Sequence, residues 1–241
     1  MAGSVFERVE KKYIISSAQY RSLMRHISEH CTADLYPESD ICSVYYDTND
    51  HLLIRRSLEK PVYKEKLRIR SYGVPQPDTP VFVELKKKLL GTVYKRRVTL
   101  GYAEAMDFLG NVHGRGRELS QIEKEIAYCF DLYRTLHPAM FISYHRTSFV
   151  GKHDYGLRIT FDSDVLSRDT ELELAKGIWG DRILPEEDFI LEVKTLKSMP
   201  LWLSGALDEC KIYPGSFSKY GTAYNRLLAN TTSGKGAVKK C

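Results

Sequence analysis

The sequence predicts an α+β fold: an antiparallel β-barrel tunnel with a charged lumen and helices packed outside it. Eight segments are rich in Val, Ile, Tyr and Phe, four others have helical patterns, and charged residues alternate with apolar ones along the strand-like segments. Because 43% of the 241 residues are hydrophobic, the chain can bury a large core. We expect one domain over residues 1–230 and a mobile basic tail over 231–241, where Gly, Ser and Lys prevail.

The predicted strands end at Gly, Pro, Asp or Asn, and they cover residues 5–15, 41–47, 64–72, 81–88, 92–100, 139–150, 156–163 and 188–195. Two helices begin at capping boxes, in which a Ser is followed three residues later by Gln or Glu: Ser16 with Gln19 and Ser120 with Glu123. Two further helices are predicted near 199–210 and 219–229. The Pro-rich segment 73–80 predicts a turn.

Composition excludes several classes of protein. The net charge of +5 is modest, and a disordered polyelectrolyte would have blocks of like charge and few aromatic residues. No segment approaches the roughly 18–20 apolar residues that span a bilayer, and the first residues lack a secretion signal. The five cysteines are widely spaced and form no CxxC pair, which predicts neither disulfides nor zinc. We expect a soluble, cytoplasmic protein.

Charged residues share one face of each predicted strand, because side chains i and i+2 point the same way. Such pairs are Glu10 with Lys12, Arg68 with Arg70, Glu84 with Lys86, Lys95 with Arg97, Arg158 with Asp162, and Glu192 with Lys194. For one strand alone, a solvated sheet face is the ordinary explanation. The repetition of Arg and Lys with single acidic residues favours a lumen. In segment 94–98 either Lys95 and Arg97 or Arg96 alone could face inward, and we favour the first because it leaves Val98 on the apolar face.

The candidate inward cations outnumber the carboxylates. They are Lys12, Arg68, Arg70, Lys86, Lys95, Arg97, Arg158 and Lys194, against Glu10, Glu84, Asp162 and Glu192. Crowded cations require anionic counter-charge, so this surplus predicts a ligand with several linked phosphates. The few carboxylates predict a divalent cation, Mn²⁺ or Mg²⁺. For Glu10 and Glu84, salt bridges to Lys12 and Lys86 are the alternative.

An ordered series of motifs extends from about Phe6 to Leu228: ERVEKKY, SVYYDT, KLRIRSY, VFVELKKK, YKRRV, ISYHRTSF, LRITFD, ILEVKT and FSKYGTAYNR. The series resembles the polyphosphate polymerase (VTC) domain family, a CYTH-like branch of the triphosphate tunnel metalloenzymes. By that resemblance the tunnel would be lined by Lys12, Arg68, Arg70, Lys86, Lys95, Arg146 and Arg158. Glu192 would hold the metal, Ser218 and Lys219 would contact phosphate, and Tyr144 would be a tunnel tyrosine. Arg8 replaces the first Glu of the wider superfamily's ExExK signature, which favours the polymerase branch.

The resemblance implies a metal-dependent transfer of the terminal phosphoryl group of ATP onto a growing polyphosphate chain. The expected ligands are ATP, triphosphate and polyphosphate. Two alternatives stay open: a triphosphatase that hydrolyses inorganic or nucleoside triphosphate, and a non-catalytic module that binds polyphosphate or inositol phosphate. No nucleic acid is expected, because the tyrosines are scattered rather than gathered beside a basic groove. An inositol phosphate effector or a membrane-complex partner would not be visible in this chain.

Overall fold

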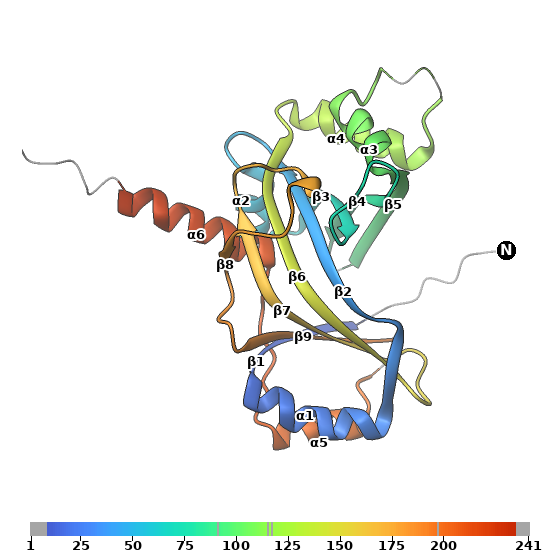
Figure 1. Cartoon of the computed structure of the whole chain (residues 1–241), viewed down its shortest axis with the longest axis vertical. Helices are drawn as coiled ribbons and strands as arrows, with labels where there is room; N and C mark the ends of the chain where they lie inside the picture. The colour runs from blue at the N-terminus through green and yellow to red at the C-terminus, as the bar shows by residue number, and fades with distance from the viewer. Residues whose placement is uncertain (1–8, 91, 115, 117, 197, 235–241) are drawn as a thin grey trace, which may run out of the picture. The chain divides into compact units, whose positions relative to one another are not determined.

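The computed structural model describes residues 9–90, 92–114, 116, 118–196 and 198–234 (Figure 1). The strands are β1 (Val9–Ser16), β2 (Cys31–Asp47), β3 (Tyr63–Tyr72), β4 (Pro80–Leu89), β5 (Thr92–Gly101), β6 (His137–Gly151), β7 (Arg158–Arg168), β8 (Asp181–Arg182) and β9 (Asp188–Thr195). The helices are α1 (Ser17–His30), α2 (Leu52–Leu58), α3 (Tyr102–Gly110), α4 (Gln121–Tyr133), α5 (Leu201–Glu209) and α6 (Lys219–Gly234), with a 3₁₀ turn at Leu174–Lys176.

The strands form one sheet in the order β1-β9-β7-β6-β2-β3-β4-β5, and β8 pairs with β7. The pairings of β1 with β9, β9 with β7, and β2 through β5 are antiparallel. The predicted α+β class and antiparallel sheet are therefore confirmed. The hydrogen-bonded ring of a closed barrel is not present among the described strands, because the strand order has two ends, β1 and β5.

The chain divides into two compact units. The first unit contains the chain up to Asp40, Tyr144–Val165 and Leu184–Ser218, and the second contains Ile41–Ser143, Leu166–Ile183 and the chain from Lys219 onward. Strands β2, β6 and β7 each contribute residues to both units. That residues 1–230 form one domain stays a prediction.

The four predicted helices are present, and both capping boxes form. Two helices had no start signal: α2 follows His51, which makes no side-chain cap, and α3 follows β5 directly at Gly101. Helix α6 reaches Gly234, so residues 231–234 of the predicted tail are helical. That the tail is mobile stays a prediction, and its remainder lies outside the described residues, as does Arg8. In the described ranges no helix combines the length and apolar character needed to span a bilayer.

The core of the first unit lies between the apolar faces of β1, β7 and β9 and two helices. Tyr13, Ile159 and Leu191 of the strands are buried with Leu23 of α1 and Leu203 of α5. Figure 1 shows α1 and α5 side by side against these strands. These strands are buried on this face, so their alternate residues are left for the opposite face.

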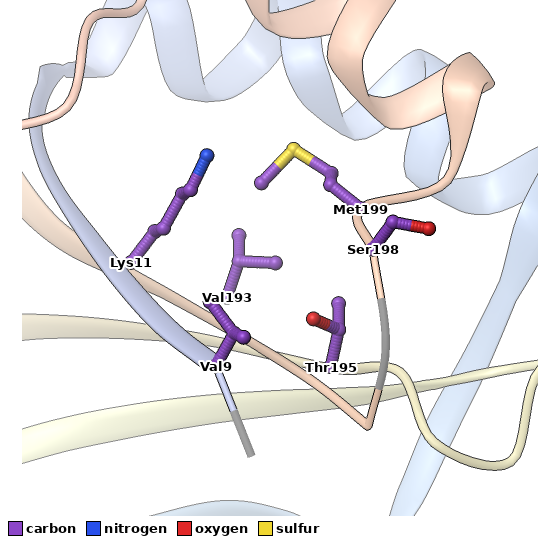
Figure 2. A pocket seen from close by; sticks show the side chains of 6 residues that line it. All are labelled: Val9, Lys11, Val193, Thr195, Ser198 and Met199. Atoms are coloured by element: carbon purple, nitrogen blue, oxygen red, sulfur yellow. The ribbon is translucent and has the colours of Figure 1, made fainter. Parts of the chain in front are cut away.

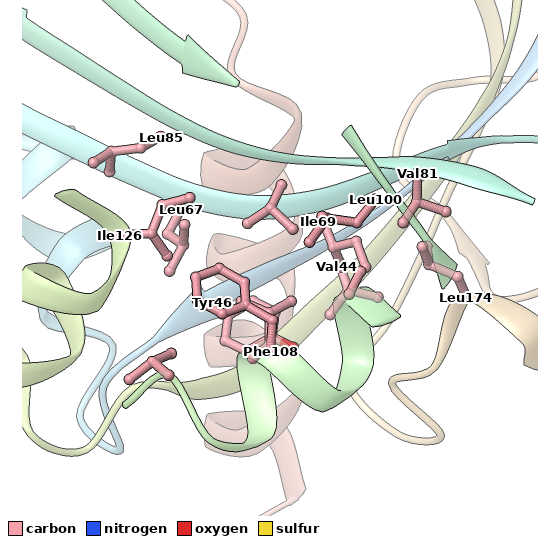
Figure 3. Close-up of a cluster of buried hydrophobic side chains, with 14 of the residues drawn as sticks. Val44, Tyr46, Leu67, Ile69, Val81, Leu85, Leu100, Phe108, Ile126 and Leu174 are labelled. Carbon is pink, nitrogen blue, oxygen red and sulfur yellow. The ribbon is translucent and has the colours of Figure 1, made fainter. Parts of the chain in front are cut away.

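The core of the second unit lies between β2 to β5 and helices α3 and α4 (Figure 3). Leu67 of β3 and Leu85 of β4 pack with Phe108 of α3 and Ile126 of α4, and all four are fully buried. The helices cover the odd-numbered residues of β3 and β4, so the even-numbered residues, which carry most of the charges, point away from this core.

Candidate active site: two charged sheet faces

The second unit carries a cation-rich face on β2 to β5, which we call the β2–β5 face. Cross-strand pairing aligns Tyr45, Arg68, Glu84 and Arg97 in one row and Lys66, Lys86 and Lys95 in the next, with Arg70 opposite Ser43 and Phe82. In these rows six Arg and Lys side chains therefore share this face with Glu84: Lys66, Arg68, Arg70, Lys86, Lys95 and Arg97. The following row on the same face adds Lys64 opposite Lys88. Another carboxylate at the end of β2, Asp47, is committed to backbone N–H groups of α2.

Glu84 is the centre of this face. Its side chain is 1% exposed, and its Oε2 atom accepts from Arg68 Nη2 at 2.7 Å. Its Oε1 atom lies 2.7 Å from both Arg97 Nη2 and Lys95 Nζ. Burial alone would raise the pKa of Glu84, but Arg68, Arg70 and Lys95 outweigh burial and hold the pKa far below its usual value. Glu84 thus forms the internal salt bridge that the sequence left open, with Arg68, Lys95 and Arg97 as its partners instead of Lys86.

The direction of segment 94–98 agrees with the favoured alternative. Lys95 and Arg97 point to Glu84, whereas Arg96 lies 3.4 Å from Glu125 of α4. Val98 packs against the core of the second unit, as expected. Arg97 also lies 4.3 Å above the ring of Phe82, which adds a cation–π contact.

Tyr45, which is not among the predicted site residues, also belongs to this face. Arg68 Nη1 donates to the Tyr45 hydroxyl at 2.9 Å. Burial would raise the pKa of this phenol, but Arg68, Arg70 and Lys66 lower it overall to about 8. Alternation places Tyr45 with Ser43 on one face of β2 and Lys66 with Arg68 on one face of β3, but only the pairing of β2 with β3 brings Tyr45 to Arg68.

The start of α6 is attached to the same face. Tyr220 stacks on Tyr45 with ring centroids 4.7 Å apart, and its hydroxyl donates to Asp47 Oδ2 at 2.8 Å. Lys219, which the sequence predicted to contact phosphate, is the first residue of α6 and directly precedes Tyr220. Ser218, predicted with it, is the last residue of the first unit, and both side chains are half-buried.

The first unit carries a second charged face on β1, β9 and β7, which we call the β1–β9–β7 face. Lys12 Nζ lies 2.8 Å from Glu192 Oε1 and 3.4 Å from Glu10, and Lys194 Nζ lies 3.1 Å from Glu192 Oε2. Burial would lower the pKa of Lys12, but Glu192 and Glu10 outweigh burial and raise it above its usual value. Lys12 therefore stays charged between two carboxylates.

Arg146 of β6 joins this network. Its Nε and Nη2 atoms donate to the two oxygens of Asp162 at 2.5 and 2.7 Å, and Nη2 lies 3.6 Å from Glu192 Oε2. The guanidinium is 5.2 Å from the ring centroid of Tyr144, and the role of Tyr144 in a tunnel stays a prediction. Of the residues that only the family resemblance suggested, Arg146 thus lies beside Glu192, and Tyr144 lies beside Arg146.

Arg158 is placed differently from the other predicted cations. It is opposite Lys194 in the sheet, so it lies on the β1–β9–β7 face, but its Nη2 atom pairs with Asp34 of β2 at 2.9 Å. Its side chain is 47% exposed. The structure therefore brings Lys12, Lys194 and Arg146 to Glu192 and leaves Arg158 at the margin of this group.

The predicted metal ligands differ in their fitness for a divalent cation. Mg²⁺ and Mn²⁺ bind one or two carboxylates and take their other oxygens from phosphate and water. Glu10 and Glu192 fit this requirement, because both approach the Lys12 ammonium and are therefore close together. Glu84 fits less well, because the guanidinium groups of Arg68 and Arg97 hold its two oxygens together with Lys95, whereas the Glu192 oxygens are held mainly by two lysines with flexible stems. Over the described residues, no group of three or more His, Cys, Asp or Glu side chains could hold a metal by itself.

A cavity of about 230 Å³ lies on the other side of β1 and β9 (Figure 2). Its lining residues are Val9, Lys11, Val193, Thr195, Ser198 and Met199. The strand residues among them are odd-numbered, whereas Lys12 and Glu192 are even-numbered and point to the opposite face. This cavity is therefore not part of the charged face.

A family model described as the VTC domain matches residues 7–228, which is nearly the whole chain. The chain belongs to the VTC domain family. The match confirms the resemblance that the ordered motifs indicated. A comparison with curated proteins finds no match.

Two solved structures share the fold of this VTC domain. A putative adenylate cyclase from Bacillus halodurans aligns with a TM-score of 0.54 and 15% identity, over 88% of this chain and 93% of its own. A putative adenylyl cyclase from Hippeastrum with a dominant triphosphatase activity aligns with a TM-score of 0.53 and 16% identity, over 89% of this chain and 93% of its own. At these identities the likeness establishes the fold, which is the one that the family resemblance implied.

Proposed function

We propose that this VTC domain is a metal-dependent polyphosphate polymerase, which transfers the terminal phosphoryl group of ATP onto a growing polyphosphate chain. The observation that carries the proposal is the β2–β5 face, where six Arg and Lys side chains share one sheet surface with Glu84. A face with such an excess of positive charge suits a ligand that brings several linked negative charges.

The proposed reaction needs no nucleophilic side chain, because the acceptor is itself a phosphate oxygen. Catalysis of phosphoryl transfer is mostly positioning and neutralisation of charge. Arg68 and Arg70 supply planar forks that match two phosphate oxygens at once, and Lys86 supplies a point charge. Glu84 keeps the Arg68 and Arg97 side chains oriented, so we assign it to positioning rather than to the metal.

A divalent cation, Mn²⁺ or Mg²⁺, would bridge phosphate oxygens and offset their charge when bound. Glu192 and Glu10 would hold this cation. Lys12, Lys194 and Arg146 hold the Glu192 carboxylate in position.

Each predicted residue keeps a role in this proposal. The residues that act on the transferred group are Lys12, Arg68, Arg70, Lys86, Arg146 and Arg158, and those that bind the rest of the substrate are Lys95, Arg97, Tyr144, Lys194, Ser218 and Lys219. That one lumen contains all of them stays a prediction from the family resemblance.

Hydrolysis of triphosphate is the second candidate function. The Hippeastrum protein, which shares the fold, has a dominant triphosphatase activity. The same cations would hold the substrate, and water would replace phosphate as the acceptor. A binding module without turnover is the outcome if neither reaction occurs.

One experiment distinguishes these functions. The purified protein is incubated with ATP and Mn²⁺ or Mg²⁺, and the products are separated on a gel that resolves phosphate chains. Long chains are expected for the polymerase. Release of phosphate without chains would support the hydrolase, and no turnover with either metal would leave only binding.

A further inference from the structure

A buried hydroxyl on the β1–β9–β7 face has no hydrogen-bond partner. Thr160 of β7 is 1% exposed, and its Oγ1 atom has no partner within the part of the chain that the structure describes. An unsatisfied buried hydroxyl lowers stability, and Val has almost the same shape without that cost. Packing alone therefore does not explain the presence of the Thr160 hydroxyl at this buried position.

Thr160 lies directly opposite Glu192 in the sheet, and Glu192 lies opposite Lys12. The three side chains form one row across β7, β9 and β1. Along β7, Arg158 and Asp162 flank Thr160 on the same face, because each is two residues away. The Thr160 side chain is thus the cross-strand neighbour, on the same face, of the residue whose carboxylate we assigned to the metal.

The local charge balance favours a cation over a phosphate as the partner of this hydroxyl. Three cations around Glu192 meet three carboxylates: Lys12, Lys194 and Arg146 against Glu10, Glu192 and Asp162. Among these described residues the charges balance, so an anion is attracted less strongly here than to the β2–β5 face. A hydroxyl beside a carboxylate is a hard oxygen donor set, and P-loop enzymes hold Mg²⁺ with a Ser or Thr hydroxyl and an Asp carboxylate.

We propose that Thr160 Oγ1 and the Glu192 carboxylate together bind a divalent cation. The inference rests on the proposed function, since it adds a ligand to the metal site assumed there. Lys12 and Lys194 now hold the Glu192 oxygens, but their side chains are 29% and 28% exposed and have flexible stems. They can turn toward bound phosphate and leave a Glu192 oxygen for the cation.

Binding of Mn²⁺ alone to the full chain tests this inference, with free Mn²⁺ followed by electron paramagnetic resonance. Thr160→Val should weaken Mn²⁺ binding by about tenfold or more, and Thr160→Ser, which keeps the hydroxyl, should restore it. Ser143→Ala is the matched control. Ser143 also has a buried, unpartnered hydroxyl, but alternation places it on the opposite face of β6 from Tyr144 and Arg146, so its loss should leave Mn²⁺ binding unchanged.

Thermal unfolding supplies the second readout. Thr160→Val should melt at the same temperature as the wild type or higher, because it removes an unsatisfied polar group. Melting several degrees lower would reveal a structural hydrogen bond and overturn the inference. An Mn²⁺ affinity of Thr160→Val equal to that of the wild type would also overturn the inference. If Glu192→Gln nevertheless binds Mn²⁺ more weakly, the metal site of the proposed function remains, but Thr160 is not one of its ligands. If the wild type binds no Mn²⁺, the result contradicts both the metal site of the proposed function and the role of Thr160 in it.

Discussion

The charged faces of the two units differ in how their charges are balanced. On the β2–β5 face, six Arg and Lys side chains share the surface with Glu84, which is saturated by three of them. On the β1–β9–β7 face, Lys12, Lys194 and Arg146 are matched by Glu10, Glu192 and Asp162, and Arg158 is matched by Asp34. Strand alternation produces both faces. The difference in charge balance therefore arises from the residue types that occupy the charged positions of each face.

The comparison teaches what each face can bind. An excess of cations is relieved by an anion with several charges, as triphosphate is. A balanced network attracts an anion less strongly, but its carboxylates can exchange an ammonium for a divalent cation, and the released ammonium can then contact phosphate. A phosphate site and a metal site can therefore be built from the same residue types, with the ratio of cations to carboxylates deciding between them.

The strongest test of the cation-rich face concerns stability. Glu84→Gln leaves Arg68, Lys95 and Arg97 without their buried counter-charge, so we expect the free energy of unfolding to fall by about 3–5 kcal/mol. Urea unfolding measures this loss. Glu125→Gln is the control: its partner, Arg96, is 53% exposed, so the change should be under about 1 kcal/mol. Equal effects of the two variants would contradict the central role of Glu84.

The pH dependence of stability follows from the same carboxylate. Because the folded state holds the pKa of Glu84 below its usual 4.5, its contribution is fully present above about that pH and is lost as pH falls toward the folded value. Wild-type stability should therefore drop steeply below about pH 4.5. In Glu84→Gln this part of the acid dependence should disappear, as urea unfolding at several pH values would reveal. An unchanged acid profile would mean that another carboxylate is responsible.

The balanced face should respond in catalysis rather than in binding. Glu192→Gln removes a proposed metal ligand but also a negative charge, so metal-free binding of triphosphate should survive or strengthen. Turnover should fall by about two to three decades, which corresponds to about 2–4 kcal/mol of transition-state stabilisation. Calorimetry and product gels measure the two quantities. Near-native chain synthesis with unchanged metal dependence would show that Glu192 is not a metal ligand and would leave Glu10 as the candidate.

Arg70→Ala should weaken both triphosphate binding and turnover, because Arg70 is a buried cation on the β2–β5 face. A charge-assisted hydrogen bond is worth about 1.5–3 kcal/mol, so affinity should fall by roughly ten- to a hundredfold. Arg96→Ala is the matched control, since Arg96 points to Glu125 on the opposite face. If both variants lower affinity equally, phosphate does not bind to this face of the sheet.

The smallest expected effect is a pH step in binding. The Tyr45 phenol, with its pKa near 8, is neutral below that pH and adds a negative charge to the β2–β5 face above it. Affinity for triphosphate should fall a few-fold, on the order of threefold, as pH rises through 8. Because the folded state lowers the pKa of Tyr45 from its usual 10.0, the same ionisation increases the free energy of unfolding as pH rises from about 8 to 10, and this contribution is fully present above pH 10. Calorimetry across this range, with Tyr45→Phe as the variant that lacks the step, measures the effect; a step of equal size in Tyr45→Phe would assign it elsewhere.

Much of the candidate site was predictable because alternation along a strand is a local property. The pairs Arg68 with Arg70 and Lys95 with Arg97 each share a face as the i, i+2 rule requires. The same rule applied to KLRIRSY would have added Lys66. The place of Tyr45 in the site could be recognised only from the fold. Its hydrogen bond with Arg68 and its stacking on Tyr220 join segments that are far apart in the chain.

By itself, the sequence determined the strand segments except β8 and residues 31–40 of β2, the capped starts of α1 and α4, the family, and which residues share a face. Each of these depends on side-chain spacing over a few residues or on the order of motifs. Only the tertiary structure decided the partners: Glu84 with three cations, Arg158 with Asp34, and Thr160 with none among the described residues. Charge pairing depends on which strands become neighbours and how they are registered, and a one-residue shift in register would have exchanged every one of these contacts.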